Sequence, residues 1–264
     1  MLRSRLPAIS VKRRSSVSAA LLRMPPAALG ALLALALGGL GFADRVLGAS
    51  AGEVTHLSGA VVARKTDGQS RILSVKSRVE EGDVLATAEN SYARVKFGDG
   101  TEAVLRPATQ VKIDRFNFEE QRPQQDNVVF SLLKGGMRAV TGLLAKRNPA
   151  NFRVATPSAT IGIRGTHFGV QYCNNDCAGL PSPKGGPVPD GLYVDVADGI
   201  ITVTSKVGSV VVNLGEFAYV LNADSIPVLV PANEAVKPVL PPQATGPGIA
   251  GGTVGKIGGL ECSI

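Results

Sequence analysis

Short apolar runs separated by glycine are the feature that most restricts what this chain can fold into. Between residues 54 and 221 the runs are four to seven residues long, and Gly or Asp-Gly stands between many of them. Within 91–97, Tyr, Arg and Lys alternate with Ala, Val and Phe, which is the period of a half-buried strand. Glycine suits the separators because it accepts a positive φ at little cost. The predicted strands are 54–57, 60–63, 91–97, 101–105, 110–113, 128–133, 137–141, 152–155, 159–163, 167–172, 192–196, 199–205, 209–213 and 217–221.

These runs predict an all-β domain over residues 52–222, built as a β-solenoid or a β-sandwich of short strands. Helical periodicity is weak and confined to 132–144, where Gly135, Gly136 and Gly142 argue against a long helix. After residue 222 the composition changes to repeated Pro and Gly. Such a segment cannot bury enough apolar surface to offset its chain entropy, so we predict a flexible, disordered tail over 223–264.

Residues 1–51 have the three parts of a secretory signal peptide. A basic segment precedes the apolar stretch 25–43, and the small residues Ala49-Ser50-Ala51 follow it. We expect cleavage after Ala51, with an uncleaved signal-anchor as the alternative. Because the positive flank stays inside, both readings place the rest of the chain outside the cytoplasm. We therefore expect a periplasmic or secreted protein, or an inner-membrane-anchored one if the leader is not cleaved.

The basic charge of the chain belongs mostly to this leader. The whole chain has a net charge of +7, but residues 52–264 hold 21 basic and 20 acidic side chains. The sequence therefore predicts no nucleic-acid partner. A small basic group remains, which we interpret as a solvated face: Lys134, Arg138, Lys146, Arg147 and Arg153.

No motif for a metal, a cofactor or catalysis stands out. His56 and His167 are the only histidines, and neither has metal-ligand spacing, so we expect surface or hydrogen-bonded core residues. The segment 248–256 resembles a phosphate-binding loop, but Ala250 stands where that loop needs Gly and Ile257 where it needs Ser or Thr. The sequence predicts a protein that is not an enzyme and that holds no cofactor.

The cysteines favour one local disulfide. In an oxidising compartment Cys173 and Cys177 would close a small loop at the start of the polar insertion 174–190. Two free thiols, or pairing of either with Cys262, are the alternatives. If the local bridge forms, Cys262 is left over as a candidate for an intermolecular bridge.

The pattern of strands and turns resembles the FecR domain. The resemblance covers about residues 52–222 and rests on 79–87, 91–101, 104–109, 129–136, 152–168 and 195–220. It implies structural roles for the motif residues: the glycines would lie at chain reversals, and Arg164 would bond neighbouring carbonyls or an acid. The motif residues are Gly82, Asp83, Gly98, Gly100, Thr156, Pro157, Gly162, Arg164, Gly165 and Thr166.

Iron-transport members of that family relay a receptor's signal across the inner membrane to a sigma factor. Their cytoplasmic anti-sigma segment has no counterpart in residues 1–24, so the chain is similar to a stand-alone FecR-domain protein. The resemblance implies a non-enzymatic, exported binding or sensory module that engages an envelope protein, a sensor or receptor, in signal transduction. Its contacts would be strand edges or the insertion 174–190. The alternative is a structural or cell-wall-glycan-binding surface protein, although the four tyrosines are scattered along the sequence.

Overall fold

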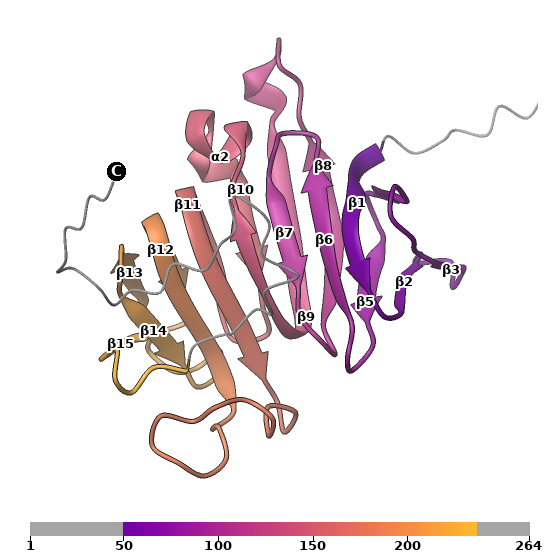
Figure 1. Cartoon of the computed structure of the whole chain (residues 1–264). Helices are drawn as coiled ribbons and strands as arrows, with labels where there is room; N and C mark the ends of the chain where they lie inside the picture. Colours follow the sequence, from indigo (N-terminus) through magenta and orange to yellow (C-terminus); the bar gives the residue numbers. More distant parts are fainter. Residues whose placement is uncertain (1–49, 237–264) are drawn as a thin grey trace, which may run out of the picture. The chain divides into compact units, whose positions relative to one another are not determined.

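The structure is a computed structural model that describes residues 50–236 (Figure 1). The described residues form one 15-stranded sheet with a single short α-helix and two 3-10 turns, so the predicted all-β class is confirmed. No helix in the described part is long and apolar enough to span a membrane. The helical elements are α2 (Leu143–Arg147), η1 (Pro123–Gln125) and η2 (Pro149–Asn151).

Three strands of 14 residues each organise the sheet: β9 (Asn127–Val140), β11 (Thr160–Cys173) and β12 (Gly191–Thr204). The two halves of each strand differ in at least one neighbour, although β11 and β12 pair with each other along their whole length. The first half of β9 pairs with β8 and β10, and its second half pairs with β7 and β11. The continuous sheet therefore divides into two layers, joined by the three strands that run through both.

The first layer has the order β15-β14-β12-β11-β9-β7-β6-β1-β4, and the second has the order β13-β12-β11-β10-β9-β8-β5-β2-β3. The first layer adds β1 (Ser50–Ser58), β4 (Arg78–Glu80), β6 (Tyr92–Phe97), β7 (Glu102–Leu105), β14 (Phe217–Val220) and β15 (Val228–Val230). The second layer adds β2 (Val61–Arg64), β3 (Ser70–Ile72), β5 (Val84–Thr87), β8 (Gln110–Asn117), β10 (Phe152–Ala155) and β13 (Ser209–Asn213).

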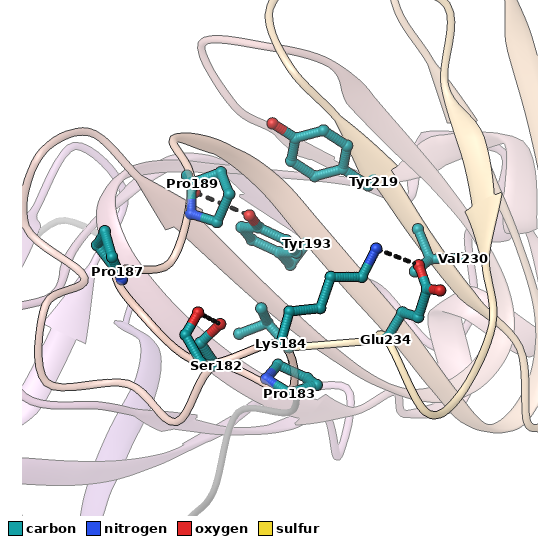
Figure 2. A pocket seen from close by; sticks show the side chains of 11 residues that line it. Ser182, Pro183, Lys184, Pro187, Pro189, Tyr193, Tyr219, Val230 and Glu234 are labelled. Atoms are coloured by element: carbon teal, nitrogen blue, oxygen red, sulfur yellow. Dashed lines mark hydrogen bonds and ion pairs between the residues drawn. The ribbon is translucent and has the colours of Figure 1, made fainter.

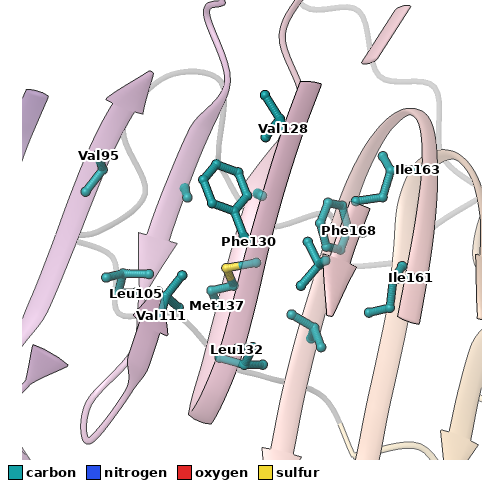
Figure 3. Close-up of a cluster of buried hydrophobic side chains, with 14 of the residues drawn as sticks. Val95, Leu105, Val111, Val128, Phe130, Leu132, Met137, Ile161, Ile163 and Phe168 are labelled. Atoms are coloured by element: carbon teal, nitrogen blue, oxygen red, sulfur yellow. The ribbon is translucent and has the colours of Figure 1, made fainter. Parts of the chain in front are cut away.

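The core lies between the two layers. The Phe97 ring, on β6, lies 4.8 Å from the Phe130 ring and 5.5 Å from the Phe116 ring, which come from β9 and β8. Figure 3 shows Val95 and Leu105 of the first layer in the same cluster as Val111 of the second. Two faces packed on one core make the arrangement sandwich-like, which decides between the two architectures that the sequence left open.

The long strands bend at glycines, where the sequence pattern predicts strand ends. Gly135 in β9, Gly165 in β11 and Gly199 in β12 have φ values of 74°, 59° and 80°. The separators thus lie inside strands and redirect them from one layer to the other. The same glycine-rich sequence can form a turn between two strands or a bend inside one strand. Only the pairing of the residues on both sides with neighbouring strands distinguishes a turn from a bend.

The β-structure continues beyond the expected domain end at residue 222. β15 pairs with β14, and Ala235 and Val236 are buried. At the other end, Ser50 and Ala51 begin β1, and the Ala51 carbonyl accepts a hydrogen bond from the Gly98 amide. Cleavage after Ala51 would therefore remove two residues of a strand. The rest of the expected leader, 1–49, and of the expected tail, 237–264, lies outside the described residues.

Candidate functional site

The outward-facing side of the first layer is a continuous surface assembled from six strands, which we call the outer face. Strand pairing places residues of neighbouring strands in rows across it. The first row contains Tyr92, Arg106, Gly136, Gln171, Tyr193 and Tyr219. The second row contains Arg94, Val104, Arg138, Gly169, Asp195 and Phe217. Residues far apart in the sequence therefore share one surface.

Two glycines let polar side chains lie flat on the outer face. A Cβ atom at Gly136 would lie 2.2 Å from Gln171 Oε1, and one at Gly169 would lie 2.2 Å from Asp195 Oδ1. The Gln171 amide and the Asp195 carboxylate therefore occupy the space above these glycines. Sequence reasoning missed both positions, because a glycine inside a strand does not reveal what lies over it.

The Arg138–Asp195 ion pair belongs to this face. Arg138 Nη2 donates to Asp195 Oδ2 at 2.6 Å, and both side chains are about nine-tenths buried. The interpretation of Arg138 as part of a solvated basic face is therefore wrong. Arg147 of the same group bonds the buried Asp126, so these cations do not act as one exposed patch.

His167 is the histidine that lies on the outer face. Its Nε2 atom is buried and has no hydrogen-bond partner among the described residues. Burial lowers the pKa of His167, and the nearby Arg138 lowers it further. The expectation of a hydrogen-bonded core histidine is wrong at this nitrogen.

A groove of about 310 Å³ lies at one end of the first row (Figure 2). Its floor includes Tyr193 and Tyr219, whose ring centroids are 4.9 Å apart. Insertion residues 182–189 form one wall and residues 230–236 form another. Lys184 Nζ and Glu234 Oε2, 2.6 Å apart, join the two walls. Apolar rings beside a few polar groups are typical of a ligand-binding pocket.

The two groove tyrosines are held by the start of β12 and by the insertion that precedes it. The Tyr193 hydroxyl donates to the Pro189 carbonyl at 2.8 Å, and the Tyr219 hydroxyl donates to the Asp190 carbonyl. Burial raises the pKa of both phenols, so they remain neutral donors at physiological pH.

The four tyrosines are scattered in the sequence, but three of them lie in the first row of the outer face. The fourth, Tyr172, packs against the core.

The predicted disulfide is confirmed and lies beside the groove. Cys173 and Cys177 Sγ atoms are 2.02 Å apart. The bridge packs in a small buried cluster with Val188, Tyr193 and Val236. It therefore ties the start of the insertion to the residues that form the groove. Cys262 lies outside the described residues.

Replacing both bridge cysteines, Cys173→Ser with Cys177→Ser, is expected to lower the free energy of unfolding by about 2 kcal/mol, since the bridge closes a very short loop. Because the bridge anchors the insertion, amide hydrogen exchange should accelerate in 174–190 and stay unchanged in β5 of the second layer. Thermal melting and exchange mass spectrometry of the oxidised and doubly substituted proteins measure both effects. Equal exchange in 174–190 would show that the bridge does not order the insertion.

Most of the expected motif residues lie at turns, away from the groove. Gly82 and Gly100 have φ values of 86° and 84°, and Gly98 belongs to the same turn as Gly100. Gly162 instead lies inside β11 without a positive φ, and its nearest obstacle is the Thr202 carbonyl oxygen at 3.8 Å from a built Cβ. The prediction that Gly162 lies at a chain reversal is wrong, because its strand continues on both sides.

The polar motif residues mostly hold turns and bends in place. Asp83 is fully buried and accepts hydrogen bonds from Arg71 at 2.6 and 3.1 Å. Thr156 Oγ1 exchanges hydrogen bonds with the Ala159 backbone across the turn that contains Pro157. The Thr166 amide, beside Gly165, donates to Thr141 Oγ1 at 2.8 Å.

Arg164 does not have its expected role. Its side chain is exposed and makes no hydrogen bond or ion pair with any residue that the structure describes. The arginines that bind carbonyls or acids are others, which the motif did not single out. The described residues contain no group of three His, Cys, Asp or Glu side chains that could hold a metal.

The central part of the chain is similar to a known protein family. Residues 83–178 match the family model described as FecR protein. Two crystal structures of a candidate anti-sigma factor from Parabacteroides distasonis ATCC 8503 are similar, with 16% and 17% sequence identity and a TM-score of 0.41 each. Each match covers 56% of this chain and 58% of that one. A cell surface anchoring domain is 28% identical over 25% of this chain and 86% of its own, with a TM-score of 0.24. No curated protein sequence matches the chain.

Proposed function

We propose, from the premise that this chain contains a FecR domain at residues 83–178, that it is a non-enzymatic signal-transduction module of the bacterial envelope. It engages another envelope protein, a sensor or receptor, outside the cytoplasm. The leader pattern of residues 1–51 supports export, and the groove beside the outer face supports binding. The family match covers little more than a third of the chain, so the contact surface is assigned from the groove, and the kind of partner is what the family resemblance implies.

The observation that carries the binding role is the groove with its two joined walls. The floor of the groove offers the ring surfaces of Tyr193 and Tyr219. The ion pair between Lys184 and Glu234 joins the two walls, and a partner can displace it. Both side chains of that pair are well exposed, so exchanging the pair for contacts with a partner costs little. The groove therefore suits an extended peptide segment of a partner protein better than a buried small molecule.

Lys184→Glu is expected to reduce capture of the partner about tenfold. The substitution places like charges on the two walls of the groove, at residues 184 and 234, and their repulsion moves the walls apart. Lys206→Glu is the matched control: Lys206 is equally exposed, at 68%, and pairs with Asp224 away from the groove. The measurement is recovery of crosslinked envelope proteins on each variant, identified by mass spectrometry. Equal recovery on both variants would remove the groove from the proposal.

The structure also gives one observation in favour of the alternative, a cell-wall-glycan-binding surface protein. The tyrosine pair in the groove could support a sugar ring, which the scattered sequence positions did not suggest. Sedimentation with purified peptidoglycan distinguishes the two functions. If the protein sediments with the glycan, Lys184→Glu has no effect on envelope capture, and no protein partner is recovered, the glycan function replaces the signalling one.

A further inference from the structure

Among the residues that the structure describes, Arg106 is a buried cation without an acidic partner. It follows β7 on the outer face, is 9% exposed, and its backbone amide donates to the Gly136 carbonyl at 3.0 Å. Its guanidinium makes one hydrogen bond, from Nη1 to Gln171 Oε1 at 2.6 Å. Its Nε is buried with no partner. A guanidinium has five N–H donors, so most of the donors of Arg106 are unused.

Arg138 stands next to Arg106 across the pair β7–β9. Val104 opposes Arg138 and Leu105 opposes Met137, so Arg106 and Arg138 are diagonal neighbours on the same face. Asp195 neutralises Arg138, but Arg138 Nη1 is buried and has no partner in the described part of the chain. Two guanidinium groups and one carboxylate therefore leave one positive charge uncompensated.

This arrangement is costly unless something completes it. Burial lowers the pKa of Arg106, and the nearby Arg138 also lowers it, yet a guanidinium stays charged at neutral pH. A buried charge with unused donors is destabilising until a counter-charge reaches it. Above Gly136, directly opposite Arg106, lies the Gln171 side chain, which accepts from Arg106 Nη1 and leaves Arg106 Nε without a partner among the described residues.

We propose that Arg106 and Arg138 form a binding site for an oxyanion, the carboxylate or phosphate group of a small ligand, on the outer face. The planar fork of a guanidinium matches two oxygens of such a group. Gln171 positions Arg106 by accepting from its Nη1, and Asp195 positions Arg138 by accepting from its Nη2. The site goes beyond the proposed function and does not depend on it, since it lies on the sheet and not in the groove.

The test is calorimetric titration of the full chain with inorganic phosphate and, separately, with acetate. We expect binding of at least one of them, and an increase in melting temperature at saturating ligand. Arg106→Gln should weaken that binding at least about tenfold and abolish the increase in melting temperature, and Arg106→Lys should have an intermediate effect because it keeps the charge without the fork. Arg164→Gln is the matched control, since Arg164 is exposed and unpaired among the described residues.

The outcomes separate the sources of the oxyanion. Binding of phosphate alone identifies a phosphate ligand, and binding of acetate alone identifies a carboxylate ligand. If neither ion binds, or if Arg106→Gln binds as tightly as the unchanged protein, the site does not exist. The melting temperature without ligand shows whether each variant is folded, because removing an uncompensated charge should not lower it. Loss of the site would leave the partner-capture experiment unaffected.

Discussion

Gly135→Ala is expected to lower the free energy of unfolding by about 2–5 kcal/mol. Gly135 has a φ of 74°, which costs a side-chain-bearing residue about 1–2 kcal/mol. Its Cβ would also lie 2.8 Å from the Ala108 carbonyl oxygen and from Thr109 Cα, and such overpacking costs about 1–3 kcal/mol. Because this bend carries β9 from one layer to the other, relieving the contact requires moving backbone. Urea denaturation of the purified protein measures the loss.

Gly82→Ala is the matched control for that experiment. Gly82 has a comparable φ of 86°, but nothing lies within 4 Å of the Cβ that alanine would add. It should lose only the conformational part, about 1–2 kcal/mol. Equal losses at the two positions would show that the close backbone approach at Gly135 is not what holds the bend.

Asp195→Ala is expected to cost about 3–5 kcal/mol, because it leaves Arg138 buried without its carboxylate. The double variant Arg138→Met with Asp195→Leu should regain most of this stability, since an apolar pair of similar volume avoids the desolvation of two charges. Chemical denaturation measures these variants, and Arg138→Met alone and Asp195→Leu alone complete the double-mutant cycle.

Asp224→Ala provides the comparison with an exposed pair. Asp224 lies 3.1 Å from Lys206, and both side chains are largely exposed, so its loss should cost about 1 kcal/mol or less. A similar small cost for Asp195→Ala would show that the outer face is wetter than its burial indicates. It would also weaken the case for an uncompensated charge on Arg106.

Local features of the chain were predictable because their physics is local. Alternation placed the strand at 91–97, and the structure has β6 at Tyr92–Phe97. The spacing of Cys173 and Cys177 predicted a bridge that the structure contains. In each case the residues that decide the outcome lie within a few positions of one another.

The candidate sites could not be read in the same way. Arg138 looked like a solvated cation because its partner, Asp195, is 57 residues away in the sequence. Arg164, the arginine that the motif singled out, is exposed, whereas Arg106 is buried against Gln171, which is 65 residues away. Whether an arginine is an exposed surface charge or part of a buried site depends on the residues that the neighbouring strands place beside it.

The sequence alone determined that the chain is β-rich, where most of its strands lie, and that its centre resembles a FecR domain, and it favoured the cysteine pairing that the structure shows. Only the tertiary structure decided that the breaks at Gly135, Gly165 and Gly199 are bends inside long strands rather than strand ends. Glycine permits both conformations equally, and the choice is made by hydrogen bonds to strands distant in the sequence. Those same pairings place three arginines and three tyrosines on one face, which no local pattern encodes.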